Sequence, residues 1–157
     1  MRFLSLFSKR PDFSDGEIDL YLSDDDVRDP SCGIDDGYTF CIYPHKSNHY
    51  AGYVSLRIGE SPELFYLGHI GYRIEQDYRG NGYAQKACRL IIPLIRKLGI
   101  RHPVITTDTN NMPSRKTCEN LGCVLEGITP VPEKYQPVCA GSKAKCRYIW
   151  QAFEGDI

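Results

Sequence analysis

The sequence lacks any long hydrophobic stretch. Nowhere among its 157 residues do 18 apolar residues follow one another, which excludes a helix that spans a bilayer. It also lacks an excess of charge, since 19 Lys and Arg stand against 20 Asp and Glu and the net charge is −1. Nucleic-acid binding relies on clustered positive charge, so we expect neither a nucleic-acid partner nor a membrane partner. The N-terminus has no long apolar core followed by a cleavage site, and we therefore expect a cytoplasmic location.

Cysteine pairs of the C-x-x-C type are also missing. The chain has seven cysteines, an odd number, whereas a structural zinc site usually contains such pairs and a disulfide framework an even count. We therefore expect free thiols that pack as small hydrophobic side chains, and no metal site. The seven positions are Cys32, Cys41, Cys88, Cys118, Cys123, Cys139 and Cys146.

The first half of the chain contains strand signals. A length of 157 residues, 41% of them hydrophobic, fits a single domain over residues 1–157. Residues 23–37 are rich in Asp, Gly and Pro and indicate a loop or a short capped helix. Aromatic and β-branched residues predict strands over 38–43 and 50–58, joined as an antiparallel hairpin. A third strand is predicted over 64–75, after a turn at 59–62.

In the second half the hydrophobic period changes. From 82 to 98 apolar residues recur at steps of three and four, which is typical of an amphipathic helix, and Pro93 is expected to kink it. We predict a strand over 104–108, a helix over 113–120, a strand over 123–128, a loop over 129–144 and a last strand over 146–153. A meander followed by alternating strands and helices predicts an α/β sandwich, with a mixed, mostly antiparallel central sheet flanked by helices.

A glycine-rich segment joins the third strand to the first helix. It reads EQDYRGNGYA over residues 75–84, and Gly80 and Gly82 let the backbone turn tightly and approach a ligand closely. The helix that begins here has N–H groups without partners and partial positive charge at its N-terminus. The segment therefore predicts a site for a phosphate or a diphosphate.

Two common nucleotide motifs do not fit this segment. A P-loop requires Lys and then Ser or Thr after its last glycine, but Tyr83 and Ala84 follow Gly82. A dinucleotide fingerprint needs a small residue where Gln85 stands, and a parallel βαβ unit that the sequence does not predict. Two interpretations of the segment remain. It is either a binding motif of the pattern Arg-x-x-Gly-x-Ala, from Arg79 to Ala84, or an ordinary glycine turn that begins a helix.

Residues 68–127 resemble the GNAT superfamily of acetyl-CoA-dependent N-acetyltransferases, and within it the acetyltransferases near the ribosomal-protein N-terminal group. In that family the pattern Gln/Arg-x-x-Gly-x-Gly/Ala opens the helix that binds the diphosphate of coenzyme A, and a splayed strand precedes it. A second pattern, Asn-x-x-Ser followed by Leu-Gly, corresponds here to Asn111, Ser114 and residues 121–122. The resemblance implies acetyl-CoA as cosubstrate, a GNAT-like fold, and cofactor contacts from Tyr72, Ile74, Arg79, Gly80, Asn81, Gly82, Tyr83, Ala84, Asn111 and Ser114.

The sequence departs from the family pattern at one position. Many members carry a Tyr seven residues after the motif Asn, where it protonates the departing thiolate, and Cys118 stands at that position here. Cys118 is either a weak acid in place of the phenol or a packed helix residue, in which case water or the amine's own proton completes the reaction. Glu75 and His69, on the strand beside the cleft, are candidate general bases, and each also has a purely structural interpretation.

The resemblance therefore implies an enzyme that transfers an acetyl group from acetyl-CoA to a primary amine, either a small molecule or a protein N-terminus. The amine would attack the thioester directly. A non-catalytic coenzyme A-binding module remains an alternative because of the missing Tyr, and a binding module for another nucleotide is a third. We expect the acceptor to meet residues 23–37, 59–66 and 129–144. The edge strands of such a sheet are compatible with a homodimer.

Overall fold

The central element of the protein is a mixed sheet of eight strands. The structure is a computed structural model that describes residues 10–23 and 27–151. Within these residues the strands lie side by side in the order β1-β2-β3-β4-β5-β6-β8-β7. All neighbouring pairs are antiparallel except β5 and β6, which are parallel. The strands are β1 (Phe13–Ser14), β2 (Ile18–Leu22), β3 (Asp36–Pro44), β4 (Gly52–Ile58), β5 (Ile70–Ile74), β6 (Val104–Asp108), β7 (Val124–Pro130) and β8 (Ala144–Ile149). The predicted fold class is confirmed.

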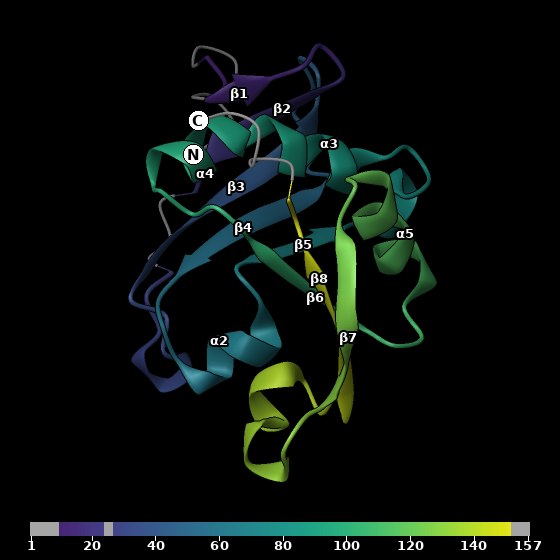
Figure 1. Cartoon of the computed structure of the whole chain (residues 1–157). Helices are drawn as coiled ribbons and strands as arrows, with labels where there is room; N and C mark the ends of the chain where they lie inside the picture. Colours follow the sequence, from purple (N-terminus) through teal and green to yellow (C-terminus); the bar gives the residue numbers. More distant parts are fainter. Residues whose placement is uncertain (1–9, 24–26, 152–157) are drawn as a thin grey trace.

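Three helices cover one face of this sheet (Figure 1). They are α3 (Tyr83–Leu90), α4 (Ile92–Lys97) and α5 (Met112–Asn120). Ala87, Cys88, Ile91 and Ile95 are fully buried and pack in one core with side chains from β2, β3, β4, β6 and β8. The 3.6-residue period read from the sequence therefore corresponds to a real buried face.

The predicted helix over 82–98 is two helices. Ile91 leaves helical geometry, with φ −88° and ψ 4°, and Pro93 lies in the first turn of α4. A proline has no N–H to donate, and its ring clashes with the carbonyl of the residue four positions earlier, here Arg89, so a new helix begins there instead of a kinked continuation. The strand over 104–108 and the helix ending at Asn120 agree with prediction.

The predicted strand over 64–75 is wrong in its first half. Residues Pro62–Leu67 form the short helix α2, and β5 begins only at Ile70. Ser61 accepts a hydrogen bond from the Leu64 N–H at 3.2 Å and Pro62 occupies the first turn, a helix start that the apolar run 64–67 concealed. Gly68, with φ +77°, ends the helix.

The remaining differences lie near the two ends of the chain. Strands β1 and β2 were not predicted, and η1 (Pro30–Cys32) is a 3-10 turn capped by Asp29 within the predicted loop 23–37. Residues Asp24 to Asp26 lie outside the described part. The loop 129–144 contains two 3-10 turns, η3 (Glu133–Tyr135) and η4 (Pro137–Cys139). The last strand ends at Ile149, short of the predicted 153, and residues 152–157 are outside the described part.

All seven cysteines are free. Within residues 10–23 and 27–151, no helix is long and apolar enough to cross a membrane. The same residues contain no group of three or more His, Cys, Asp or Glu side chains placed to hold a metal ion.

Candidate functional site

The sheet opens between its two parallel strands. Strand β5 pairs with β4 at five positions, but its only ladder pair with β6 in the described chain is Ile70 with Ile105. On either side of β5, the His69 carbonyl accepts from the Arg57 N–H and the Glu75 N–H donates to the Ala51 carbonyl. The odd-numbered residues between them therefore point their N–H and C=O groups toward β4. Because bonding directions alternate along a strand, the N–H and C=O groups of Tyr72 and Ile74 face the gap, where the Ile74 carbonyl already accepts from the Arg79 Nε. An extended ligand could bond to the strand there.

The loop that follows β5 is shaped by glycines. After the 3-10 turn η2 (Gln76–Tyr78), Gly80 and Gly82 take left-handed conformations with φ +86° and +72°. A Cβ atom at Gly80 would meet nothing within 4 Å, and at Gly82 only the Lys86 Nζ at 3.9 Å. The backbone therefore needs glycine at both positions for its geometry, and it faces open space. The strand, loop and helix form a parallel β5-α3-α4-β6 unit, which the sequence analysis did not predict.

The N–H groups of this loop have no partners. Within the described chain, no acceptor pairs with the backbone N–H of any residue from Gly80 to Gln85, and the first helical bond is from the Lys86 N–H to the Gly82 carbonyl. These N–H groups lie at the N-terminus of α3, where the helix macrodipole adds partial positive charge. The arrangement is suited to bind a phosphate or diphosphate group.

Two cations lie beside these N–H groups. The Arg79 Nε donates to the Ile74 carbonyl at 2.8 Å, which folds the guanidinium back over the end of β5. The Lys86 Nζ donates to the Asn81 carbonyl at 2.9 Å. Asn81 in turn donates from its side chain to the Tyr78 carbonyl at 3.0 Å and fixes the turn. Arg79 was predicted from the glycine pattern, whereas Lys86 lies outside that pattern and was not predicted.

A second group of predicted residues meets on the other side of the gap. Asn111 caps α5 by accepting from the Ser114 N–H at 3.2 Å. The Tyr72 hydroxyl lies 2.9 Å from the Ser114 Oγ and 3.8 Å from the Cys118 Sγ. Burial raises the pKa of Tyr72, so its hydroxyl keeps the proton at neutral pH. Tyr72 thus forms one cluster with Ser114 and Cys118, which lie 42 and 46 positions further along the sequence.

The two candidate bases differ in their surroundings. The Nδ1 of His69 accepts from the Val104 N–H at 3.0 Å, so the neutral ring carries its proton on Nε2. Burial lowers the pKa of His69, and the charges of Arg147 and Arg57 lower it further. The Glu75 side chain is 44% exposed at the end of β5, 4.0 Å from the Arg73 Nε. This geometry favours His69 as a hydrogen-bond donor and leaves Glu75 as the candidate carboxylate.

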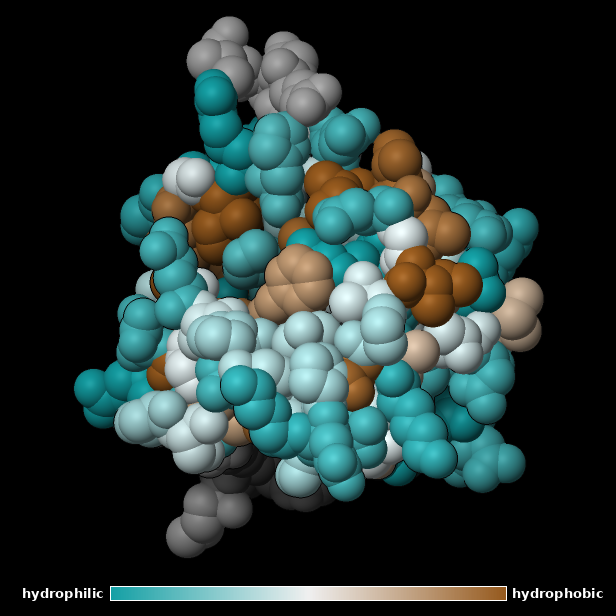
Figure 2. Space-filling view, turned by 60° about the horizontal axis from the view of Figure 1, so that its bottom comes forward, coloured by the Kyte–Doolittle hydropathy of each residue, from teal (hydrophilic) through white to brown (hydrophobic). Residues whose placement is uncertain are grey.

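The described parts of the three segments expected to meet the acceptor, 27–37, 59–66 and 129–144, lie together around α2 (Figure 1). Ser61 donates to the Cys32 carbonyl at 3.3 Å, which joins residues 23–37 to 59–66. The Tyr66 and Tyr135 rings stack at 5.4 Å, which joins 59–66 to 129–144. Figure 2 shows this end of the molecule, where hydrophobic residues form separate small groups among hydrophilic ones.

Two arginines that the sequence analysis did not consider support this end. Arg57 donates to the Leu67 and Gly68 carbonyls at 3.1 and 3.2 Å. Arg147 donates to the Phe65 carbonyl, and its guanidinium lies 3.7 Å from the centre of the Phe65 ring. Together they satisfy the carbonyl groups at the C-terminus of α2. Arg147 comes from β8, 82 positions from Phe65, and Arg57 comes from β4, just before α2. No local pattern identifies either, because the contacts depend on how β4, β8 and α2 pack together.

Comparisons with known proteins agree with this architecture. The sequence matches the acetyltransferase (GNAT) domain family over residues 5–124. Among curated proteins, none matches the sequence. Similar solved structures include the ribosomal-protein-S5-alanine acetyltransferase from Vibrio fischeri, with a TM-score of 0.58 and 21% identity over 74% of this chain and 63% of that one.

Two further structures are similar in fold. One is the microcin C7 self-immunity acetyltransferase MccE in complex with acetyl-CoA and AMP, with a TM-score of 0.55 and 24% identity over 72% of this chain and 59% of that one. The other is the acetyltransferase from Salmonella typhimurium that modifies the N-terminal serine of ribosomal protein L7/L12. Its TM-score is 0.54, with 21% identity over 72% of this chain and 62% of that one. The chain spans about three fifths of the length of these proteins.

Proposed function

The chain belongs to the GNAT acetyltransferase family, and on that premise we propose that it transfers the acetyl group of acetyl-CoA to a primary amine. The observation that carries the proposal is the run of unpaired N–H groups from Gly80 to Gln85. Such a run binds a diphosphate, and acetyl-CoA contains one between its adenosine and pantetheine parts. The opening beside Tyr72 and Ile74 supports the rest of the assignment, because it offers strand-like hydrogen bonds to an extended arm.

The proposed reaction needs three conditions: a neutral amine, a polarised carbonyl group and close approach of the two. Acetyl-CoA supplies the acetyl group in activated form, as a thioester. The Tyr72 and Ile74 N–H groups on the gap side of β5 are placed to hydrogen-bond a carbonyl oxygen as negative charge develops on it. The nitrogen of the amine forms the new bond to the acetyl carbon, and the carbon–sulfur bond breaks.

Proton transfers complete the balance. In the proposal Glu75, at the exposed end of β5, takes the proton that the attacking amine loses, as a general base. The departing thiolate takes a proton from water. Cys118 is fully buried and is assigned to packing. His69 serves as a hydrogen-bond donor on the same strand, because its Nδ1 is already engaged by Val104.

For the acceptor we propose a primary amine that approaches from the end of the molecule around α2. The support is the contact of residues 23–37, 59–66 and 129–144 with one another at that end. Two of the similar structures are enzymes that modify ribosomal proteins, according to their names. A protein N-terminus is therefore the acceptor class to test first, with small amines second.

The experiment has two stages. Thermal-shift measurements with acetyl-CoA, coenzyme A, ATP and NAD identify the ligand class, and we expect only the coenzyme A compounds to raise the melting temperature. An assay of thiol release with a panel of peptides, amino acids and small amines then tests acetyl transfer. A larger shift with ATP or NAD would overturn the cofactor assignment. Tight coenzyme A binding without thiol release on any amine would favour the non-catalytic module, to which the missing Tyr at position 118 points.

A further inference from the structure

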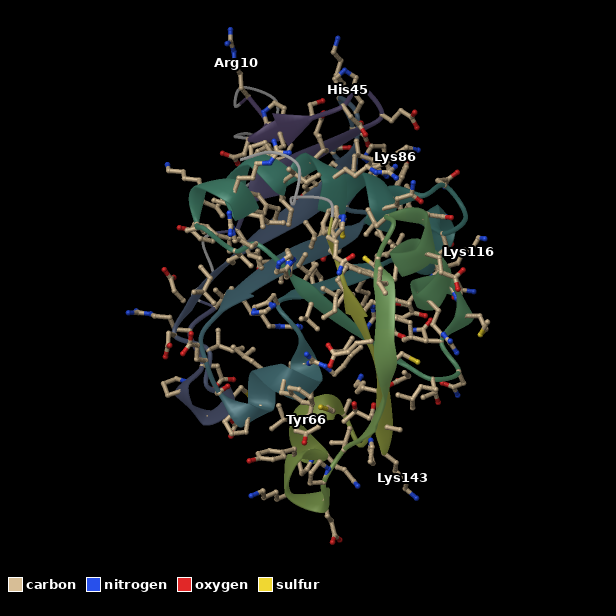
Figure 3. The ribbon with its side chains drawn as sticks, viewed as in Figure 1. Arg10, His45, Tyr66, Lys86, Lys116 and Lys143 are labelled. Atoms are coloured by element: carbon tan, nitrogen blue, oxygen red, sulfur yellow. The ribbon has the colours of Figure 1, made fainter. Side chains whose placement is uncertain are left out.

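An ion pair connects the phosphate-binding loop to the N-terminal hairpin. The Lys86 Nζ lies 2.7 Å from a carboxylate oxygen of Glu17 while it donates to the Asn81 carbonyl at 2.9 Å. Lys86 is the fourth residue of α3, and Glu17 is in the turn between β1 and β2. Figure 3 shows Lys86 and His45 at one end of the molecule, with Tyr66 and Lys143 at the other. The pair thus lies on the cofactor side and not on the acceptor side.

The position of Lys86 is unfavourable for a helix considered alone. A cation near a helix N-terminus is repelled by the positive end of the macrodipole, which favours Asp and Glu there. The first turn of α3 contains no acidic residue, so the cation is compensated from outside the helix by Glu17. A residue that opposes the local preference and lies beside a binding site indicates a role in that site.

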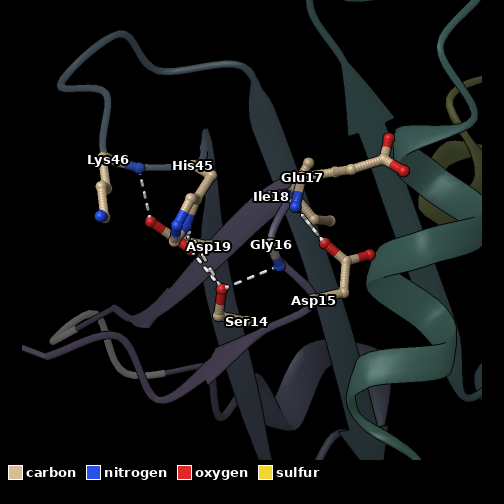
Figure 4. Close-up of polar contacts among 8 residues, drawn as sticks. All are labelled: Ser14, Asp15, Gly16, Glu17, Ile18, Asp19, His45 and Lys46. Atoms are coloured by element: carbon tan, nitrogen blue, oxygen red, sulfur yellow. Dashed lines mark hydrogen bonds and ion pairs between the residues drawn. The ribbon is translucent and has the colours of Figure 1, made fainter.

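Glu17 is held in place by its own hairpin. The Asp15 carboxylate accepts from the Glu17 and Ile18 N–H groups, each at 2.8 Å, and the His45 N–H donates to the Glu17 carbonyl at 2.9 Å. Asp19, 3% exposed, joins this hairpin to the β3–β4 turn by accepting from Ser14, His45 and Lys46. Figure 4 shows the network, with the Glu17 side chain extended away from it. The carboxylate therefore reaches Lys86 from a fixed backbone.

We propose that Glu17 is an internal counter-ion that competes with the cofactor diphosphate for Lys86. Without a cofactor, Glu17 neutralises Lys86 and holds it against the Asn81 carbonyl. When the diphosphate binds the unpaired N–H groups next to it, the ammonium group moves from carboxylate to phosphate, for which Lys is a common ligand. Glu17 thereby weakens cofactor binding and favours its release. The inference rests on the proposed function, since it requires coenzyme A to bind at this loop.

A double-mutant cycle tests the competition. The four proteins are the unmodified chain, Glu17→Gln, Lys86→Met and the double variant, and the affinity for coenzyme A is measured by titration calorimetry. We expect Glu17→Gln to tighten binding about threefold to fivefold, the range of a partly exposed ion pair. Lys86→Met is expected to weaken binding, and Glu17→Gln to have no effect in that background. Glu133→Gln, an equal change of charge in the loop 129–144, is the matched control and leaves the affinity unchanged.

If the ion pair between Glu17 and Lys86 only stabilises the fold, a different result is expected. In that case Glu17→Gln lowers the melting temperature and leaves the affinity for coenzyme A as it was, or weakens it, and the inference is overturned. Dephospho-coenzyme A, which keeps the diphosphate but lacks the 3′-phosphate, is expected to show the same cycle. An effect seen only with coenzyme A would overturn the assignment to the diphosphate. If the unmodified chain bound no coenzyme A, the proposed function would fail too, whereas binding without coupling between residues 17 and 86 refutes the counter-ion alone.

Discussion

The side chain at position 118 illustrates how one substitution changes a site. Cys118 is fully buried, and its Sγ lies 3.8 Å from the Tyr72 hydroxyl. A hydrogen bond with Cys123 lowers the pKa of the Cys118 thiol, and burial acts in the opposite direction. A tyrosine at this position would need space that the Tyr72 ring and the core now fill. The contacts are those of a packed residue.

Replacing this thiol tests that interpretation. We expect Cys118→Ala to lower the free energy of unfolding by about 1 kcal/mol, through lost packing. The kcat of acetyl transfer should change by less than about threefold, because no step is assigned to the thiol. Cys88→Ala removes an equally buried thiol from α3 and serves as the control. A loss of about a hundredfold in kcat for Cys118→Ala alone would show that the thiol is the acid after all.

Gly82 carries the sharpest prediction for a single backbone position. Its φ is +72°, so Gly82→Val is expected to cost roughly 1–2 kcal/mol of stability, and the new side chain would stand in front of the unpaired N–H groups. We expect coenzyme A affinity to fall by at least about a hundredfold, measured by titration calorimetry. Gly99→Val introduces the same strain, at φ +75° and also in open space, but away from the loop. Equal affinity losses in the two variants would contradict the assignment.

Elements were predictable from the sequence where local pattern and packing agree. The hairpin of β3 and β4 and the helix α5 have clear periods and clear ends, and they were found. The helix α2 was missed because its apolar residues, such as Leu64 and Phe65, are equally compatible with a strand, and only the cap at Ser61 distinguishes the two. Strand β1 has two residues and gives no period. Strand β2 has five, with apolar residues at alternate positions, and this signal was overlooked.

The same reasoning applies to the candidate site. The loop 79–84 and the pair Asn111 and Ser114 are local patterns, so they can be read from sequence. The ion pair between Glu17 and Lys86 and the contact between Tyr72 and Ser114 join residues distant in the chain. Such pairs follow from the order of strands in the sheet, which no local pattern specifies.

The start of α2 gives a prediction at the level of one helix. Ser61→Ala removes the side-chain oxygen that accepts from the Leu64 N–H and should lower the free energy of unfolding by about 1 kcal/mol in urea denaturation. Ser61→Gly also lacks the hydroxyl, but glycine is tolerated at this position and costs only a few tenths of a kcal/mol. Equal stability of the Ala and Gly variants would contradict the capping role.

For the molecule as a whole, two carboxylates link separate parts of the sheet. Burial raises the pKa of Asp19, but hydrogen bonds from Ser14, His45 and the Lys46 N–H outweigh it and hold the pKa below its usual value. Asp108 behaves in the same way, with Ser142 and Lys145 as its partners. Asp19 connects the β1–β2 hairpin to the β3–β4 turn, and Asp108 connects β6 to β8.

These shifts predict loss of stability in acid. A carboxylate whose pKa is lowered by folding stabilises fully above its unfolded pKa, about 3.9 for Asp, and this contribution is lost as the pH falls through the folded-state pKa. We expect the free energy of unfolding, measured in urea, to fall steeply below about pH 4. The Asp19→Asn variant should be less stable than the unmodified chain at neutral pH, but its free energy of unfolding should fall less on acidification. An acid slope equal to that of the unmodified chain would contradict the role of Asp19.

The single ladder pair between Ile70 and Ile105 has a consequence for how the sheet exchanges its amide hydrogens with deuterium. Strand β5 lies in the interior of the sheet by position, yet over its last residues one side has the bonding groups of an edge strand. The amides of Tyr72 and Ile74 should therefore exchange rapidly, while those of Gly71 and Arg73 on the same strand stay protected by β4. A ligand arm that occupies the gap would slow only the first pair, and would act as the missing strand between two half-sheets.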